Sequence, residues 1–417
     1  MSDEKPIEPN EPPLAPPAQS SLQPTNPAGL PAWTPPPQDP PRNTWGHRLA
    51  AAVVLAAVVA ASAGAGIGWS LGHSLQPRSA GVTTPVESPI PLQPGGSSTG
   101  TFNASAVAAK VTPAIVNINT KLATGGAAAG TGLIVSSSGE VLTNDHVVRG
   151  STSIAVTVQG RSQTYTAHVV AVNQSQDVAL IQLEGASSLP TVRLADSTQL
   201  KVGDPVIAVG NALGQGGAPR VTQGSITALD QTITASEGGS QSETLNGMIE
   251  SDAVIYQGDS GGALVNAAGQ VVGMITAGQA QGFRSAASNV GYAVTSNTAL
   301  GVVNRIRAGE QAADLTYGQV GYMGVSAQTL TPAGATQVGL NVSSGALVVG
   351  VQPGSPAEAA GLAQGSAITS VGGTAVTSTT DLGTAIKSHK PGEKVAVTWV
   401  DRGGSHTSTV TLGGINP

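Results

Sequence analysis

The sequence predicts a mainly β protein, with two six-stranded antiparallel β-barrels followed by a small α+β domain, behind a disordered tail and one transmembrane helix. From Ala104 onward, short apolar runs alternate with turn residues, and six such runs suggest one closed antiparallel barrel. A second set of six runs follows between Pro205 and Thr295. Aromatic residues make up only 3% of the chain and hydrophobic residues 40%. The core must therefore consist of Ala, Val, Ile and Leu.

The strands of both barrels are expected between short Gly-containing turns. The first barrel is assigned to residues 114–119, 131–135, 141–143, 153–158, 164–173 and 177–183, and the second to residues 205–209, 221–229, 247–254, 263–265, 271–277 and 291–295. Residues 296–308 then carry Leu300, Val303 and Ile306 at helical spacing, with Gly309 after them. We therefore expect a helix that closes a folded unit over residues 104–309.

The composition excludes several classes of function. The formal net charge is −6 and no block of Lys or Arg is present, whereas binding to phosphates needs a basic patch. Nucleic acid is therefore not an expected partner. The chain has no Cys and its six His are scattered, so we expect no disulfide, no metal site and no cofactor.

The first part of the chain predicts a membrane anchor. Residues 1–48 are dense in Pro and read as a disordered cytoplasmic tail, although a proline-rich ligand for a partner domain is an alternative. Residues 49–71 carry no charge, and as a helix they would reach about 35 Å, enough to span a bilayer. Arg42 and Arg48 precede this segment and place the amino terminus in the cytoplasm.

A competing interpretation makes this apolar segment part of a signal peptide that is cut after Ala61-Ser62-Ala63, which would release a secreted form. The 48 residues that precede the segment are long for a signal peptide and favour the anchor. Residues 72–103 are rich in Pro, Gly and Ser and read as a flexible linker that holds the folded part off the membrane.

The most informative stretch is Gly258-Asp259-Ser260-Gly261-Gly262. A serine between glycines has no bulky neighbours, so its hydroxyl can face a cleft, as a nucleophile requires. The N–H groups of Gly258 and Ser260 can point at one position, where an oxyanion would form during attack on a carbonyl. A plain glycine-rich hairpin is the alternative interpretation, because the chain contains 55 Gly.

A nucleophilic serine needs a base, and the base needs a group that fixes its tautomer. His146 ends a short apolar strand, whereas His168 lies mid-strand and is expected to face solvent. His146 is therefore the predicted base. Asp177, at the start of the apolar run Val178 to Leu183, is the predicted orienting carboxylate. Asp145 is its rival, although adjacent residues on an extended chain point in opposite directions.

In this order, the motifs around His146, Asp177 and Ser260 resemble those of the HtrA (DegP-like) serine proteases of the chymotrypsin clan. They are Thr143-Asn144-Asp145-His146-Val147-Val148, Asp177-Val178-Ala179-Leu180 and Gly258-Asp259-Ser260-Gly261-Gly262. The resemblance extends over roughly residues 104–414, and it implies an active site between the two barrels. Most of the family has Asn before the nucleophile. Asp259 is instead the residue of the digestive enzymes, where it pairs with a newly cut amino terminus, and of some actinobacterial secreted members.

Residues 318–414 resemble the PDZ domain of HtrA proteins. The resemblance rests on Gly321-Tyr322-Met323-Gly324-Val325, on residues 354–362 and on the expected helix after Ser378. It implies that Tyr322, Met323, Gly324 and Val325 form a loop that binds a peptide's terminal carboxylate. Leu382 and Ile386, on one face of that helix, would complete an apolar pocket with Met323 and Val325. A small αβ domain without a ligand is the alternative.

The resemblance implies a membrane-anchored serine endopeptidase that degrades unfolded or misassembled proteins outside the cytoplasm. Val254, six residues before Ser260, stands where trypsin-like relatives carry an Asp. An apolar residue there would leave a Lys or Arg charge unpaired, so we expect cleavage after small or medium apolar residues. The family often forms trimers, which makes a homo-oligomer a further expectation. The alternative function is a catalytically silent, PDZ-containing scaffold or chaperone of the cell envelope.

Overall fold

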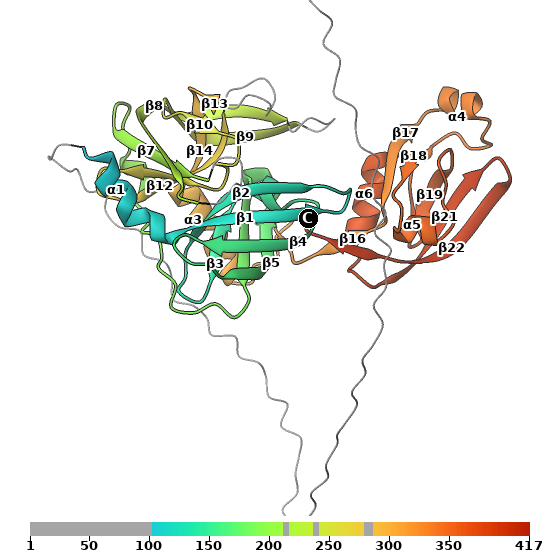
Figure 1. Ribbon diagram of the computed structural model, residues 1–417. Helices are drawn as coiled ribbons and strands as arrows, with labels where there is room; N and C mark the ends of the chain where they lie inside the picture. Colours follow the sequence, from blue (N-terminus) through green and yellow to red (C-terminus); the bar gives the residue numbers. More distant parts are fainter. Residues whose placement is uncertain (1–101, 212–216, 237–241, 279–286) are drawn as a thin grey trace, which may run out of the picture. The chain divides into compact units, whose positions relative to one another are not determined.

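The computed structural model describes residues 102–211, 217–236, 242–278 and 287–417. The predicted tail, the apolar segment 49–71 and nearly all of the linker 72–103 lie outside the described residues. Within the described ranges, no helix combines the length and apolar character that crossing a membrane requires. The described part is mainly β, as predicted (Figure 1).

The first sheet follows helix α1 and contains β1 to β6 and β15. The bounds are α1 (Ala104–Val111), η1 (Thr112–Ala114), β1 (Ile115–Leu122), β2 (Ala127–Ile134), β3 (Glu140–Thr143), α2 (Asp145–Val148), β4 (Ser151–Val158), β5 (Thr164–Asn173), η2 (Gln174–Gln176), β6 (Val178–Leu183) and β15 (Thr316–Tyr317). The strand order is β15-β5-β4-β1-β2-β3-β6, and β5 also pairs with β6. Strand β5 therefore pairs with both β4 and β6, so that each of the strands β1 to β6 has two neighbours in this sheet. Strand β15 is an additional partner of β5.

The second set of strands forms a closed barrel in the order β11-β12-β14-β9-β8-β7, which confirms the prediction for these six strands. The bounds are η3 (Ser197–Gln199), β7 (Pro205–Gly210), β8 (Arg220–Ser236), β9 (Ser242–Ser251), β10 (Ile255–Tyr256), β11 (Ala263–Asn266), β12 (Val271–Gly278), β13 (Ala287–Ser288) and β14 (Gly291–Thr295). Strand β8 is longer than predicted. Its second half is polar and pairs with β9 through several register shifts, and Asp230 there has a φ of +56°.

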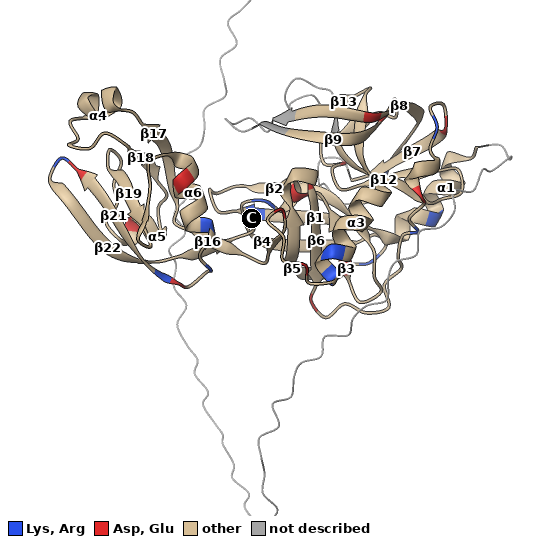
Figure 2. Ribbon diagram, turned by 180° about the vertical axis from the view of Figure 1, so that it is seen from behind, with Lys and Arg blue, Asp and Glu red and all other residues tan. Residues whose placement is uncertain are grey.

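Helix α3 (Ser296–Arg307) follows β14 directly. The Thr295 hydroxyl caps it by accepting a hydrogen bond from Thr298 N (3.1 Å), and Gly309, with a φ of +68°, lies just beyond its end. Leu300, Val303 and Ile306 are buried, as the helical spacing predicts. Figure 2 shows basic positions on α3, and one of them, Arg307, pairs with Glu140 of β3. The helix therefore packs on the core and is also tied to the first sheet.

The C-terminal domain is a second α+β unit with its own hydrophobic core. Its elements are β16 (Val320–Tyr322), β17 (Val325–Leu330), α4 (Pro332–Val338), β18 (Gly345–Val351), α5 (Pro356–Ala359), β19 (Ala367–Val371), β20 (Thr374–Ala375), α6 (Thr379–Lys387), β21 (Lys394–Asp401), β22 (Gly404–Thr411) and β23 (Gly413–Ile415). The main sheet has the order β17-β18-β19-β21-β22, and β16 pairs with β23. Strand β17 is thus an edge strand, and its outer edge has no partner within the described ranges.

Candidate active site

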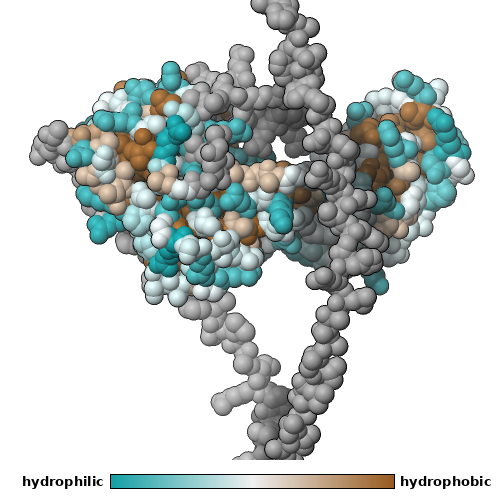
Figure 3. Space-filling model, viewed as in Figure 1, coloured by the Kyte–Doolittle hydropathy of each residue, from teal (hydrophilic) through white to brown (hydrophobic). Residues whose placement is uncertain are grey.

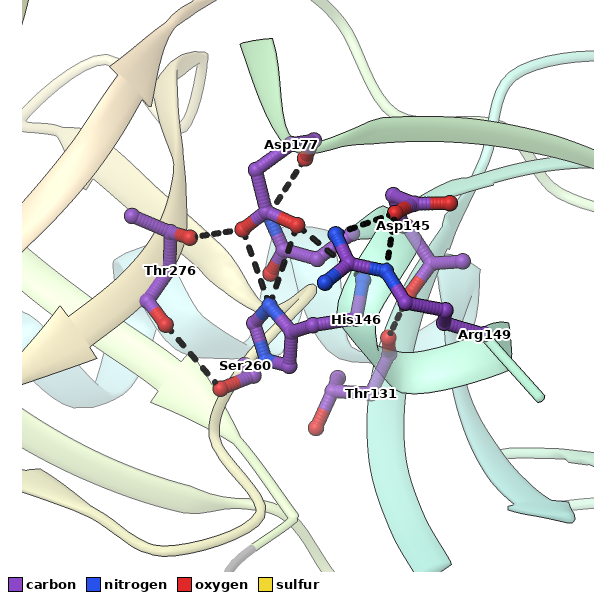
Figure 4. A network of polar contacts seen from close by, with 9 residues as sticks. Thr131, Asp145, His146, Arg149, Asp177, Ser260 and Thr276 are labelled. Carbon is purple, nitrogen blue, oxygen red and sulfur yellow. Dashed lines mark hydrogen bonds and ion pairs between the residues drawn. The ribbon is translucent and has the colours of Figure 1, made fainter. Parts of the chain in front are cut away.

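Three segments that are far apart in sequence meet at one site (Figure 4). His146 lies on the single helical turn α2 after β3, Asp177 immediately precedes β6, and Ser260 lies between β10 and β11. Strands β3 and β6 are antiparallel and pair Thr143 with Ala179. This pairing brings the end of β3 next to the start of β6, and so places His146 beside Asp177.

The imidazole of His146 is held by Asp177 on one side. Its Nδ1 lies 3.0 Å from Asp177 Oδ1 and 2.9 Å from Oδ2, and the backbone N–H of His146 also donates to Oδ1 (3.1 Å). Asp177 has a left-handed backbone, with φ +52° and ψ +48°, a conformation that Asp tolerates better than most residues. The side-chain amide of Asn144 donates to the Asp177 carbonyl (2.9 Å) and holds this kink in place.

Asp177 is only 2% exposed. Burial by itself would raise the pKa of this carboxyl. The charge of His146 and the hydrogen bonds from His146 and Thr276 outweigh the burial and hold the pKa of Asp177 below its ordinary value. The carboxylate is therefore ionised at neutral pH and can stabilise a positive charge on the imidazole.

Thr276 of β12 is a site residue that the sequence analysis did not identify. Its hydroxyl donates to Asp177 Oδ2, and its carbonyl accepts the hydroxyl of Ser260 (3.2 Å). It therefore touches two of the three predicted catalytic residues from a strand of the second barrel. Nothing in the local sequence marks Thr276, because its role depends on the packing of β12 beside Asp177.

Ser260 is half-buried and lies beside the imidazole, which stands between it and Asp177 in Figure 4. In this structure the Ser260 hydroxyl donates to the Thr276 carbonyl. The glycine after it, Gly261, has a φ of +82°, and a Cβ at this position would lie 1.9 Å from the carbonyl oxygen of Thr131. Only glycine fits this position, which explains the glycine behind the serine in the sequence motif.

Thr131 of β2 fixes the loop that carries the serine. Its hydroxyl donates to the Gly258 carbonyl (2.8 Å), and its backbone N–H donates to the Ser260 carbonyl (2.8 Å). Within the described ranges, the N–H groups of Gly258 and Ser260 donate to no other group. Both predicted oxyanion donors are therefore free to bind a substrate oxygen.

The two rival residues lie elsewhere. His168 is 59% exposed and lies 3.9 Å from Glu184, so it faces solvent as predicted. Asp145 is fully buried, and its Oδ2 accepts from Arg149 Nε (2.7 Å). Residues 145–148 form a helical turn and not the extended chain that was expected. On that turn Asp145 and His146 still point in different directions.

Asp259 is also buried, with 3% of its surface exposed. Its Oδ2 accepts from the backbone N–H of Tyr256 (2.8 Å), which is the partner that the sequence could not identify. Burial raises the pKa of Asp259 to about 6, against the lowering effects of the Tyr256 hydrogen bond and of the Arg220 charge. Val254, the predicted specificity residue, is half-buried before β10, and its carbonyl accepts from the Thr222 hydroxyl (2.7 Å).

In the C-terminal domain, the predicted carboxylate-binding loop joins β16 to β17. Gly324 has a φ of +82°, and a Cβ there would lie 2.3 Å from Ser355 Cβ. The N–H groups of Met323 and Gly324 donate to nothing within the described ranges. The Tyr322 hydroxyl donates to Gln352, and the Gln352 N–H donates to the Gly324 carbonyl (2.9 Å). The loop is therefore braced from one side, with two N–H groups left unused.

The four apolar side chains beside this loop differ in burial. Met323, Leu382 and Ile386 are 1%, 4% and 9% exposed and belong to the domain core. Val325 is half-buried and packs against that core. Three of the four side chains that were expected to form the pocket are therefore part of the domain core, and Val325 packs against them.

No group of three or more His, Cys, Asp or Glu in the described part of the chain is arranged as a metal site. The Ser260 hydroxyl and the Asp177 carboxylate are both hydrogen-bonded to Thr276.

Two parts of the chain match known protein families. Residues 130–274 match the family described as "Trypsin-like peptidase domain", and residues 321–412 match the PDZ domain family. The chain is 35% identical over 291 residues to the serine protease Do-like HtrA of Lactococcus lactis subsp. lactis, covering 68% of this chain and 70% of the relative.

The chain is also 32% identical over 286 residues to the periplasmic pH-dependent serine endoprotease DegQ of Escherichia coli, covering 68% of this chain and 59% of the relative. A solved structure, the HtrA-type protease AlgW with a tripeptide, matches 76% of this chain and 98% of its own at 28% identity and a TM-score of 0.44. With a trypsin-like peptidase domain, one PDZ domain and these relatives, the chain is a serine endopeptidase that belongs to the HtrA family.

Proposed function

We propose that this endopeptidase is membrane-anchored and cuts unfolded or misassembled extracytoplasmic proteins, with Ser260 as nucleophile, His146 as base and Asp177 as orienting carboxylate. The observation that carries the catalytic part is the imidazole of His146, held by the buried Asp177 carboxylate and facing Ser260. A carboxylate on Nδ1 leaves Nε2 as the acceptor for a serine proton.

The reaction begins with rotation of the Ser260 hydroxyl away from the Thr276 carbonyl and towards His146. As the serine oxygen attacks the peptide carbonyl, its proton passes to Nε2, and the negative charge that develops on the carbonyl oxygen is bound by the N–H groups of Gly258 and Ser260. The imidazolium then donates this proton to the leaving amine, so the C–N bond breaks and an acyl-enzyme forms. A water molecule, deprotonated by His146, hydrolyses the ester and regenerates Ser260.

Covalent labelling tests the assignment. A fluorophosphonate should label the full-length protein, and Ser260→Ala should abolish labelling. Ser260→Ala and His146→Ala should each lower peptide turnover by several orders of magnitude, and the double variant should be little worse than either alone. His168→Ala is the matched control, because it removes a solvent-facing histidine. Near-normal proteolysis in His146→Ala would refute the assignment.

For substrate choice, we propose cleavage after small or medium apolar residues. The basis is Val254, which offers no charge to a Lys or Arg side chain in a desolvated pocket. Sequencing the products of a peptide library tests this proposal, and preferred cleavage after Arg or Lys would contradict it.

For the C-terminal domain, we propose that it binds the free C-terminus of a peptide and that binding stimulates cleavage at Ser260. The unused N–H groups of Met323 and Gly324 suit a carboxylate, and the free edge of β17 can accept the peptide as an added strand. Hydrophobic surface lies beside β17 and α6 in Figure 3. With Met323, Leu382 and Ile386 packed in the core, contact with an apolar last residue begins at Val325.

Micromolar affinity, on the order of −8 kcal/mol, is expected for such a peptide. Titration of the full-length protein with a peptide and with its C-terminal amide provides the test. Equal affinity for both would remove the carboxylate loop from the proposal, and binding without stimulation would remove the coupling.

The membrane anchor is proposed from residues 49–71 and from the two arginines before them. Full-length protein should sediment with membranes, and protease added from outside should release the catalytic unit by cutting near residues 72–103. A mature chain that begins near residue 64 and is found in the medium would show instead that the segment is a signal peptide.

We also propose that the protein forms a homo-oligomer. Cross-linking or sedimentation of the released catalytic unit would test this.

A further inference from the structure

The buried carboxylate of Asp259 lies between the two proposed oxyanion donors, Gly258 and Ser260. One carboxylate oxygen accepts from Tyr256 N, but Oδ1 has no hydrogen-bond partner within the described ranges. Gly210 of β7 packs against it so closely that a Cβ at residue 210 would lie 2.6 Å from Oδ1. A buried carboxylate with a single donor is costly to keep ionised, so its charge needs a further compensating group.

Arg220, the first residue of β8, stands opposite Gly210 in the β7–β8 pairing, and its charge acts on the Asp259 carboxylate. Its guanidinium carbon lies 4.0 Å from the centroid of the Tyr256 ring, a distance at which a cation is attracted to the face of an aromatic ring. The same Tyr256 donates its backbone N–H to Asp259. Tyr256 therefore seats the cation with its ring and contacts the carboxylate with its backbone.

Two acidic residues of the same barrel, Glu250 and Asp252, are hydrogen-bonded to β8. Glu250 accepts from the Thr227 hydroxyl (2.7 Å), and Asp252 accepts from the Ser225 N–H (2.6 Å), both on β8. The neighbours of Asp259 on β7 and β10 are Gly210 and Tyr256, and neither of them carries a positive charge. Burial raises the pKa of Asp259 to about 6, and Arg220 is the cation whose charge lowers it.

The charge on Asp259 affects the turn of residues 256–259, which directly precedes the proposed nucleophile Ser260. The backbone N–H of Asp259 donates to the Tyr256 carbonyl (3.0 Å), while the side chain accepts from the Tyr256 N–H. Residues 256–259 are thus tied together twice. Since a hydrogen bond to a carboxylate is stronger than one to a neutral acid, ionised Asp259 holds this turn, and with it the Gly258 N–H, more firmly.

We propose that Arg220 is a positioning residue for the oxyanion loop: seated on the Tyr256 ring, it keeps the Asp259 carboxylate charged and bonded to Tyr256, which holds the Gly258 and Ser260 N–H groups in place. This role rests on the proposed function of Ser260 as nucleophile. It is independent of the membrane anchor, of the natural substrates and of the C-terminal domain.

The pH dependence of the reaction tests this role, measured both as the rate of fluorophosphonate labelling and as kcat/KM between pH 5.5 and 8.5. Without the Arg220 charge, the ionised fraction of Asp259 should fall near pH 6 and change little at pH 8. Arg220→Gln should therefore lose about two- to fivefold more activity at pH 6 than at pH 8. Arg220→Lys, which keeps the positive charge, should retain most of the activity at pH 6. Arg161→Gln, which removes a charge from the turn after β4, should follow the wild type.

A second background separates positioning from general structural damage. In Asp259→Asn the carboxylate no longer titrates, so adding Arg220→Gln should cause no extra loss that is specific to acidic pH. Persistence of that loss would mean that Arg220 acts through another group and would overturn the proposal. The same is true if Arg220→Gln matches the wild type at every pH.

The inference and the proposed function fail in different ways. Labelling that survives in Ser260→Ala would overturn the assignment of the nucleophile, and the inference with it. Labelling that depends on Ser260 but has the same pH profile with and without Arg220 would overturn the inference alone. Thermal melts at each pH identify any loss of activity that is due to unfolding. If Arg220→Gln does not fold, the pH profile of Arg220→Lys is compared with that of the wild type in its place.

Discussion

Replacing Thr276 by Val removes one donor from the Asp177 carboxylate and leaves the two donors of His146 in place. A hydrogen bond to a buried charged group contributes about 1.5–3 kcal/mol. If the whole amount is lost in the transition state, kcat/KM falls by about 10- to 150-fold, because about 1.4 kcal/mol corresponds to a factor of ten. We expect kcat to fall and KM to change little, since Thr276 acts through Asp177 and His146.

The stability of Thr276→Val should fall by a similar amount at neutral pH. The lowered pKa of Asp177 means that its stabilising contribution is present above the pKa of the unfolded chain and is lost as the pH falls through the folded pKa. The difference between wild type and variant should therefore shrink below about pH 4. Urea unfolding at pH 7 and at pH 3 measures this difference, next to peptide hydrolysis. Thr276→Ser is the control because it keeps the hydroxyl. Full activity in Thr276→Val, or equal damage in both variants, would refute the reasoning.

Three further predictions concern single side chains. Gly261→Ala should abolish labelling of Ser260, because its Cβ would meet Thr131 O at 1.9 Å, whereas Gly301→Ala, with open space around its Cβ in α3, should raise stability by about 0.5–1 kcal/mol. Asp259→Asn should stabilise the protein above pH 6 by up to about 3 kcal/mol. The raised pKa of Asp259 makes the wild type lose stability as pH rises from about 4 to about 6. Equal urea midpoints for both proteins at pH 8 would contradict this. Val254→Asp should add cleavage after Arg to a peptide-library profile, and an unchanged profile would place the specificity pocket elsewhere.

The strand pattern was predictable where short apolar runs are bounded by turn residues. Strand β5 has the predicted limits of residues 164–173, and the six strands of the closed barrel all lie at predicted runs. The pattern failed where a strand continues as a polar hairpin, as in the second half of β8. Exposed polar residues can pair through their backbones, and apolar periodicity does not report such pairing.

His146, Asp177 and Ser260 could be predicted from the sequence. His146 and Asp177 lie next to the ends of recognisable strands, and Ser260 lies in a glycine-rich stretch. The left-handed backbone of Asp177 and the helical turn of His146 were not readable. Both conformations are imposed by tertiary contacts, such as the amide of Asn144 on the Asp177 carbonyl. The packed state of Met323 escaped prediction for a related reason, because an apolar residue in a loop can serve either a pocket or a core.

The residues that the sequence did not mark are those that join the two sets of strands. Thr276 of the second barrel donates to Asp177 of the first sheet, and Thr131 of the first sheet holds the carbonyls of Gly258 and Ser260 between strands of the second barrel. Neither set of strands therefore contains all three proposed catalytic residues, and these residues are aligned only when both sets are folded and in contact. Loss of either threonine should misalign the site while leaving the hydrophobic core intact, because both side chains form polar contacts and the core clusters consist of apolar side chains.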